Sequence, residues 1–175
     1  MIQTKLKLFL LSLLAVTILA CTSEQQDTDP QIPDENENEG ENMGGIANAT
    51  VWNGATITFT KAAGANPAVE ANQDRITDNV WLTRGNNGGQ IYNAVTESGS
   101  TKSSSPAGTM WALGELSNVS NLTFAPFRTA VGNPKSIVGR NLVLYIPDDN
   151  VVISVVFTSW SQSRSGGFAY TRSTE

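Results

Sequence analysis

The sequence contains no histidine and only one cysteine among its 175 residues. Without histidine, Ser-His and Cys-His catalytic pairs and histidine-ligated zinc or iron sites are excluded. One cysteine excludes an internal disulfide and a CxxC redox site. Basic residues are also scarce, with 11 Lys and Arg against 16 Asp and Glu. This balance, with a pI near 4.7, argues against a nucleic-acid partner.

Residues 1–20 have the three parts of a secretory signal. Lys5 and Lys7 give a positive start, and the apolar run that follows is too short to span a bilayer as a helix. The run ends in Ile-Leu-Ala-Cys at residues 18–21, which resembles the lipobox of bacterial lipoproteins. This resemblance implies that the Cys21 thiol carries a diacylglycerol, that the signal is cut before it, and that palmitate is among the acyl chains. An ordinary cleaved signal with a chance cysteine is the alternative.

The residue after the cysteine bears on the destination of the protein. In Gram-negative lipoproteins an Asp there is typical of inner-membrane retention, so Thr22 resembles the class directed to the outer membrane. The resemblance implies a lipid-anchored outer-membrane protein, on the periplasmic face or at the cell surface. Several acyl chains bind a bilayer far more firmly than one does.

Residues 21–45 contain eight acids, no base and almost nothing apolar. Such a segment cannot form a packed core, so we expect a disordered tether. An acidic start soon after the cysteine also resembles the surface-export signals of Bacteroidota lipoproteins, and a plain spacer is the alternative. Since two of the bases and eight of the acids precede residue 46, the rest of the chain holds nine bases and eight acids. The acidity therefore belongs to the tether.

Residues 46–175 are predicted to form one domain, long enough for a hydrophobic core without disulfides. They are rich in Ser, Thr, Asn and Gly, a composition typical of strands and turns. Apolar and polar residues alternate along most of the apolar runs, which predicts half-buried strands. The candidate strands are 56–60, 76–82 (Ile76, Val80 and Leu82 on one face, Trp81 on the other), 90–97 (Ile91 and Val95 together), 109–113, 122–127, 142–146, 151–157 and 168–172. A helical turn is the competing interpretation over 68–74.

The strongest pattern lies near the C-terminus. Residues 142–146 are apolar on both faces, and the odd-numbered residues of 151–157 share one apolar face. The turn residues at 147–150 join them into a predicted hairpin, and the Gly-rich residues 85–89 predict another. These elements favour an all-β fold, a monomeric antiparallel β-sandwich of which a jelly roll is one form. A β-barrel is the alternative.

Three stretches resemble a secreted β-domain of Bacteroidota and marine bacteria. They are WNGATITFTKAAGANP from residue 52, the segment from Glu70 to Asn93, and FTSWSQSRSGGFAYTRSTE at the C-terminus. This family has no characterised activity. The resemblance implies a β fold and an exported location, and it supplies no catalytic residue.

Residues 72–79 concentrate oxygen ligands just before a predicted strand. Calcium binds six to eight oxygens from carboxylates, amides and carbonyls, so Asp74 and Asp78 could begin a calcium site. However, the spacing departs from the EF-hand, and Arg75 stands between the two acids. The alternative is a network of turns in which Asp74 or Asp78 bonds an arginine. No other cofactor is expected.

Four tryptophans suggest carbohydrate binding, because sugars stack their apolar faces on exposed aromatic rings. Most tryptophans in a β-domain pack in the core or on a sheet. Trp160 is expected to differ, since it falls opposite the apolar face of 151–157 and beside a polar loop. If the loop at residues 85–89 lies nearby, Asn86 and Asn87 would supply amide partners for a glycan.

Hydrolysis by paired carboxylates is the one enzymatic chemistry left open. The candidates are Glu70, Asp74, Asp78, Glu97 and Glu115, but no pair is distinguished as acid and base. We therefore expect no enzyme. The expected function is an extracytoplasmic binding module, with glycans as the leading ligand class. The alternatives are a structural or assembly component of an envelope complex, with an envelope protein as partner, and a small hydrolase.

The lipid anchor can be tested directly. We expect the Cys21→Ala protein to carry no lipid. If it is still exported, it should partition into the aqueous phase, because neither the tether nor a near-neutral domain offers another membrane anchor. Growth with labelled palmitate followed by detergent partitioning measures this. Label on the variant, or a variant that stays in the detergent phase, would contradict the lipoprotein assignment.

Overall fold

The computed structural model describes residues 46–175. The signal at 1–20, Cys21 and the tether at 21–45 lie outside the described residues, so their assignments stay predictions. No helix within 46–175 is long and apolar enough to cross a membrane.

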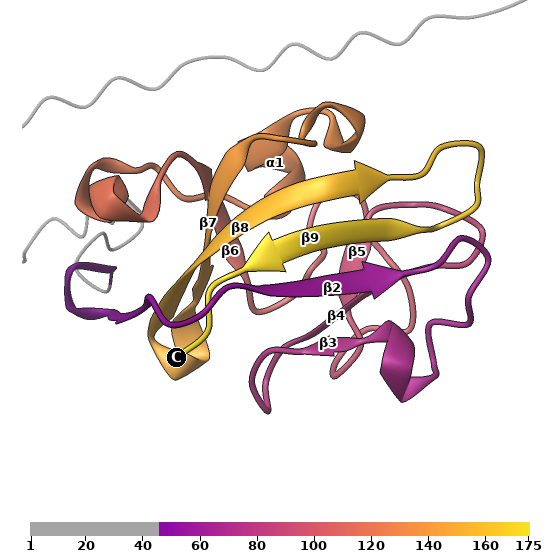
Figure 1. Ribbon diagram of the computed structural model, residues 1–175, viewed down its shortest axis with the longest axis horizontal. Coiled ribbons are helices and arrows are strands. Elements are labelled where there is room, and N and C mark those ends of the chain that lie inside the picture. Colours follow the sequence, from indigo (N-terminus) through magenta and orange to yellow (C-terminus); the bar gives the residue numbers. More distant parts are fainter. Residues whose placement is uncertain (1–45) are drawn as a thin grey trace, which may run out of the picture. The chain divides into compact units, whose positions relative to one another are not determined.

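The described residues form two β-sheets (Figure 1). The larger has six strands, with β2 (Ile57–Lys61), β9 (Phe168–Arg172), β8 (Val151–Trp160), β7 (Asn141–Ile146) and β6 (Met110–Leu113) side by side in that order. The sixth, β1 (Thr50–Trp52), runs parallel to the first residues of β8. The smaller sheet is antiparallel, with β3 (Asp74–Arg75), β4 (Trp81–Arg84) and β5 (Ile91–Asn93). The predicted all-β sandwich is confirmed, and two separate sheets replace the barrel that the sequence left open.

One hydrophobic core lies between the two sheets. It joins Val80, Leu82 and Ile91 of the smaller sheet and its hairpins to the odd-numbered residues of β8 from Val151 to Phe157, all buried. The apolar alternation predicted for 151–157 is therefore confirmed. A second cluster lies on the other face of the larger sheet, where Val143 and Val152 pack under the 3-10 helices η1 (Ile46–Asn48) and η3 (Leu116–Asn121). Strand β7 is covered on both faces, as its sequence indicated.

The predicted strand 122–127 is wrong. Only Ala125 pairs, in an isolated bridge with Trp111, and Phe127 begins the short helix α1 (Phe127–Val131). Pro126 lies between them and has no N–H to donate to a strand ladder, so the pairing stops there. A 3-10 helix, η4 (Pro134–Ser136), follows α1 closely.

Two further strands are shorter than predicted. The 76–82 run is a hairpin, since Asp74 pairs with Leu82, although Ile76, Val80 and Leu82 do share the buried face. Strand β5 ends at Asn93, and Val95 is 40% exposed instead of lying beside Ile91. The buried Asn93 amide ends this strand by hydrogen bonding: its oxygen accepts from two backbone N–H groups and its nitrogen donates to two carbonyls.

The remaining elements follow the sequence closely. The predicted helical turn within 68–74 is the 3-10 helix η2 (Glu70–Asn72). The turn at 147–150 contains the 3-10 helix η5 (Pro147–Asp149), after which Asn150 adopts the left-handed conformation with φ 51°. It joins β7 and β8 into the predicted hairpin.

A buried ion pair connects the two sheets. Asp74 on β3 accepts from Nε and Nη2 of Arg172 on β9, at 2.7 and 2.9 Å. It also accepts a 2.6 Å hydrogen bond from the hydroxyl of Tyr170, on the same strand. Burial by itself would lower the pKa of Arg172, but the hydrogen bonds and charge of Asp74 raise it above its usual value. Burial and the neighbouring carboxylate raise the pKa of Tyr170 well above its usual value, so its hydroxyl stays a donor.

Removal of one partner from this pair should be costly. We expect Asp74→Ala to lower the free energy of unfolding by about 3–5 kcal/mol, because Arg172 would be left as a buried, uncompensated charge. Urea denaturation measures the loss. Asp78→Ala, an exposed acid in the same hairpin, is the control and should change the value by no more than about 0.5 kcal/mol. Equal effects of the two substitutions would show that the pair does not stabilise the sandwich.

Candidate functional site

A β-bulge near the end of β8 reverses the side on which Trp160 lies. Phe157 pairs with Tyr170 of β9, but Ser159 pairs with Ala169, so Thr158 is an extra residue in the ladder. One extra residue shifts the alternation by one position. Trp160 therefore points to the same side as Phe157, with their ring centroids 5.7 Å apart, and packs against the main core. The expectation that Trp160 lies opposite the apolar face is wrong for this reason.

The half-buried Trp160 ring is enclosed by other side chains. The guanidinium carbon of Arg84 lies 4.1 Å from the ring centroid, over the ring. The Phe127 ring is stacked with it at an interplanar angle of 28°, and Phe168 also packs nearby. The ring face that Arg84 covers is therefore not available for a sugar to stack on. We assign Trp160 the role of positioning Arg84 by a cation–π contact.

Arg84, at the end of β4, is a buried cation without a carboxylate partner among the described residues. It is 4% exposed, and its Nε and Nη1 donate to the carbonyls of Gly89, Ser161 and Gly167. Burial lowers its pKa to about 10. Buried charges in proteins are normally paired with an opposite charge. This exception marks Arg84 as a candidate functional residue.

A second buried cation lies close to it. Lys61, at the end of β2, is 1% exposed and donates to the Gly166 carbonyl at 3.3 Å. Burial lowers the pKa of Lys61, and so does the positive charge of Arg84. The positive potential at this end of the sandwich therefore extends into its interior.

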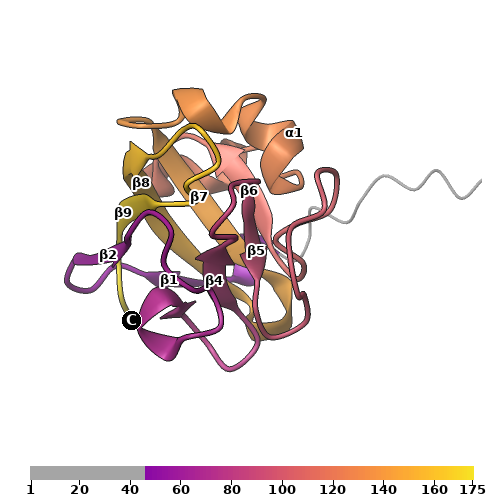
Figure 2. The ribbon, with the colours of Figure 1, turned by 90° about the vertical axis from the view of Figure 1, so that its right-hand side faces the viewer.

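Arg84 and Trp160 border an open cavity of about 880 Å³. It lies at the end of the molecule where the loop after β8, the β4–β5 hairpin and α1 meet, the end that faces the viewer in Figure 2. Its walls come from four stretches that are far apart in the sequence: 84–90, 100–102, 128–135 and 160–164. The volume is typical of a binding site for a small molecule.

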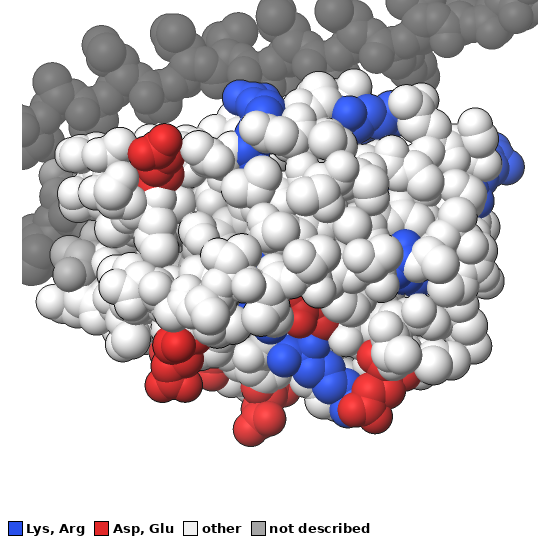
Figure 3. Space-filling model, in the orientation of Figure 1, with Lys and Arg blue, Asp and Glu red and all other residues white. Residues whose placement is uncertain are grey.

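The cavity wall is strongly basic. It contains five Lys or Arg side chains and no Asp or Glu: Arg84, Lys102, Arg128, Lys135 and Arg164. Within 46–175 the only ion pairs are Arg75–Glu70 and Arg172–Asp74, so none of the five is neutralised by a carboxylate of that part of the chain. On the face drawn in Figure 3 the side chains at the upper right and right are basic, whereas acidic side chains lie at the upper left and in the lower part, where basic ones are also present.

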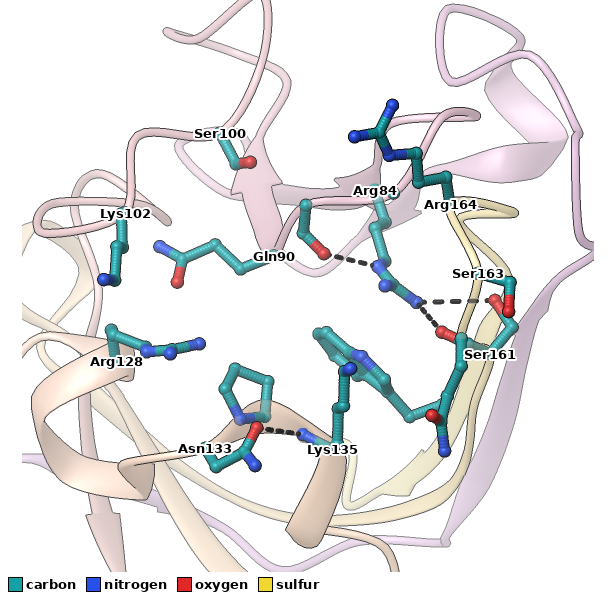
Figure 4. Close-up of a pocket in the computed structure, with 15 residues that line it drawn as sticks. Arg84, Gln90, Ser100, Lys102, Arg128, Asn133, Lys135, Ser161, Ser163 and Arg164 are labelled. Atoms are coloured by element: carbon teal, nitrogen blue, oxygen red, sulfur yellow. Dashed lines mark hydrogen bonds between the residues drawn. The ribbon is translucent and has the colours of Figure 1, made fainter.

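Gln90 brings a different group to the cavity. Its Nε2 donates to the carbonyls of Thr101 and Ser105, at 2.9 and 2.8 Å, and so fixes the long β5–β6 loop. Its Oε1 is buried and has no hydrogen-bond partner, the one such side-chain atom within 46–175. Figure 4 shows the amide turned toward Lys102 and Arg128. An unpaired buried acceptor costs stability, so it is a second candidate functional group.

Two glycines allow the walls to approach each other. A Cβ on Gly166 would lie 1.8 Å from the Gly85 carbonyl oxygen, and one on Gly88 would lie 3.0 Å from the Arg164 Cα. Ser163 and Arg164 both have positive φ, 57° and 60°, a conformation uncommon outside glycine. The loop after β8 is thus held close to the β4–β5 loop in a specific conformation.

The structure brings together only part of the set suggested by the sequence. Trp160 lines the cavity, but Asn86 and Asn87 do not, although their neighbours Gly88 and Gly89 do. The hairpin predicted at 85–89 is confirmed. Sequence reasoning missed the five bases and Gln90, and no local signal could have found them because they come from separate segments.

The acidic candidates lie elsewhere. Asp74 uses both oxygens on Arg172 and Tyr170, the alternative to calcium that the sequence offered, and Asp78 is exposed. Glu70 pairs with Arg75, Glu97 accepts from the N–H groups of its own loop, and Glu115 is exposed. None of the five lines the cavity. No group of three or more Asp, Glu, His or Cys within 46–175 could hold a metal.

No family model, curated protein or solved structure matches the chain. The geometry of the cavity and the sequence motifs are therefore the features that indicate a function for the chain.

The close approach at Gly166 gives a prediction with a matched control. Gly166→Ala should lower the free energy of unfolding by about 1–3 kcal/mol more than Gly139→Ala does. Both glycines have positive φ, 67° and 78°, so both substitutions carry the same backbone penalty, but a Cβ on Gly139 meets nothing within 4 Å. Urea denaturation of both variants is the measurement. Equal losses would mean that the two loops separate freely and do not form a fixed wall.

Proposed function

We propose that this protein is a lipid-anchored, extracytoplasmic binding module whose ligand is a glycan. The observation that carries the proposal is the open cavity of about 880 Å³ bordered by Arg84 and Trp160. Besides its bases, the wall carries hydroxyl and amide side chains from Gln90, Ser100, Asn133 and residues 161–163. Such groups can donate hydrogen bonds to the hydroxyls of a sugar and accept them from these hydroxyls. Trp160 supports the wall and is not the stacking surface.

The sequence supports the cellular setting. The lipobox-like motif ending at Cys21 implies anchoring at the outer membrane, and the acidic residues 22–45 would hold the domain away from the lipid surface. A binding module on such a tether meets polymers outside the cytoplasm. Calcium is not part of the proposal, because Asp74 already has its partners.

The alternatives have weaker support. An assembly component is expected to present a contiguous apolar patch, but the exposed large hydrophobic residues within 46–175 are five valines or isoleucines on separate segments. A hydrolase with paired carboxylates would need two of them at the cavity, where none lies.

Filling the cavity should weaken binding. We expect the full-length chain to bind at least one class of polysaccharide on a glycan array, and Ser100→Trp, in the cavity wall, to weaken that binding about tenfold or more. Ser117→Trp is the matched control, because Ser117 is exposed and lies outside the cavity lining. A wild-type chain that binds no glycan, or equal binding by the two variants, would contradict the proposal.

A further inference from the structure

We propose that the cavity selects acidic saccharides, ligands that carry carboxylate or sulfate groups beside free hydroxyls. This inference deepens the proposed glycan-binding function and rests on it. Three observations carry it: the charge of the wall, the remaining Nη2 donor of the Arg84 guanidinium and the unpaired side-chain carbonyl of Gln90.

The charge of the wall is the first observation. Residues 46–175 hold nine bases and eight acids, yet five of the bases and none of the acids line this one cavity. Five cations around a common space repel one another unless an anion lies between them. The fold therefore gathers its positive charge where a negative ligand would neutralise it. A neutral glycan would leave this repulsion in place.

Arg84 is the second observation. Its Nε and Nη1 are fixed by carbonyls, and Nη1 also lies 3.5 Å from the Ser161 hydroxyl. Within 46–175 its Nη2 donates to no protein group. The Trp160 ring lies against the guanidinium and, together with these hydrogen bonds, restricts its orientation. A fixed guanidinium with a remaining donor is suited to a planar carboxylate or to sulfate oxygens, which form short charge-assisted hydrogen bonds.

Gln90 is the third observation, and it distinguishes a saccharide from a simple anion. The unpaired Oε1 is an acceptor, so a ligand group that donates a hydrogen bond would satisfy it. Carboxylate and sulfate oxygens only accept. A sugar hydroxyl donates, and Figure 4 places this amide beside Lys102 and Arg128, where an acidic group would be bound. One ligand with both kinds of group would satisfy both sides of the cavity.

The test uses two pairs of polysaccharides, and the members of each pair share a sugar backbone and differ in whether they carry charged groups. The full-length chain is titrated with polygalacturonate and its fully methyl-esterified form, and with dextran sulfate and dextran, by affinity electrophoresis at two salt concentrations. We expect at least one charged polymer to bind about tenfold or more tightly than its neutral partner, and added salt to weaken it. The carboxylate and sulfate pairs tell the two anionic groups apart. Poly-L-glutamate, a polyanion without hydroxyls, should bind more weakly than the preferred acidic polysaccharide.

Matched variants localise the effect. Arg128→Gln removes a half-buried cation of the cavity wall, and Lys102→Gln removes an exposed one that is not needed for packing. Each should weaken binding of the acidic polymer about tenfold, as expected for the loss of one charge-assisted hydrogen bond. Arg140→Gln, an exposed arginine outside the lining, should leave it unchanged.

The outcomes separate this inference from the proposed function. Equal binding of charged and neutral polymers would overturn selectivity for acidic saccharides and leave glycan binding intact. Equal losses in Arg140→Gln and Lys102→Gln would place the binding outside the cavity and also overturn the inference. Poly-L-glutamate binding as tightly as the acidic polysaccharides would overturn both, because the site would then be a general polyanion site. So would the absence of binding to every polymer.

Discussion

The buried contact of Asp74 with Arg172 and Tyr170 is the interaction on which the arrangement of the rest depends. It is a buried, charged link between the three-stranded sheet, through β3, and the six-stranded sheet, through β9. The hydrophobic effect holds the sheets together but has no direction, whereas a bidentate carboxylate–guanidinium pair has one favoured geometry. The pair therefore sets where β4, which is paired with β3, lies relative to β8 and β9. Arg84 and Trp160 occupy the far ends of those strands.

The cavity depends on the relative position of the two sheets. Arg84 extends from the end of β4 to the carbonyls of Ser161 and Gly167, which belong to the loop after β8. The bulge at Thr158 turns Trp160 toward the core. In this position its ring makes the cation–π contact with the Arg84 guanidinium. Trp160 thus takes part in both: its ring packs against Phe157 in the core and contacts Arg84 at the cavity.

The cavity also gathers several groups that lower the stability of the folded protein. It gathers five cations, one of them buried without a carboxylate, together with an unpaired buried carbonyl and two consecutive residues of positive φ. Each of these lowers stability in the unliganded protein. Local conflicts of this kind in an otherwise consistent fold are expected at functional sites, where a ligand supplies the missing partner. In the remainder of residues 46–175, every buried side-chain nitrogen and oxygen atom has a hydrogen-bond partner.

The sequence by itself determined the features that depend on neighbouring residues. It predicted the strand at 151–157 from its alternation, and the hairpins from the turn residues at 147–150 and the glycines at 85–89. These predictions are correct because side-chain direction in a strand and turn geometry are local properties. It failed at 122–127 and at Val95, where Pro126 and the Asn93 amide end the pairing. It also could not reveal the bulge at Thr158, because a bulge is a property of the register between two strands. Only the tertiary structure decided the site. It brings basic residues from four distant stretches to one cavity and places the acids elsewhere. A domain with nearly equal numbers of acids and bases therefore has one strongly positive cavity. Net charge is a sum over the chain, but binding depends on where the charges lie in space.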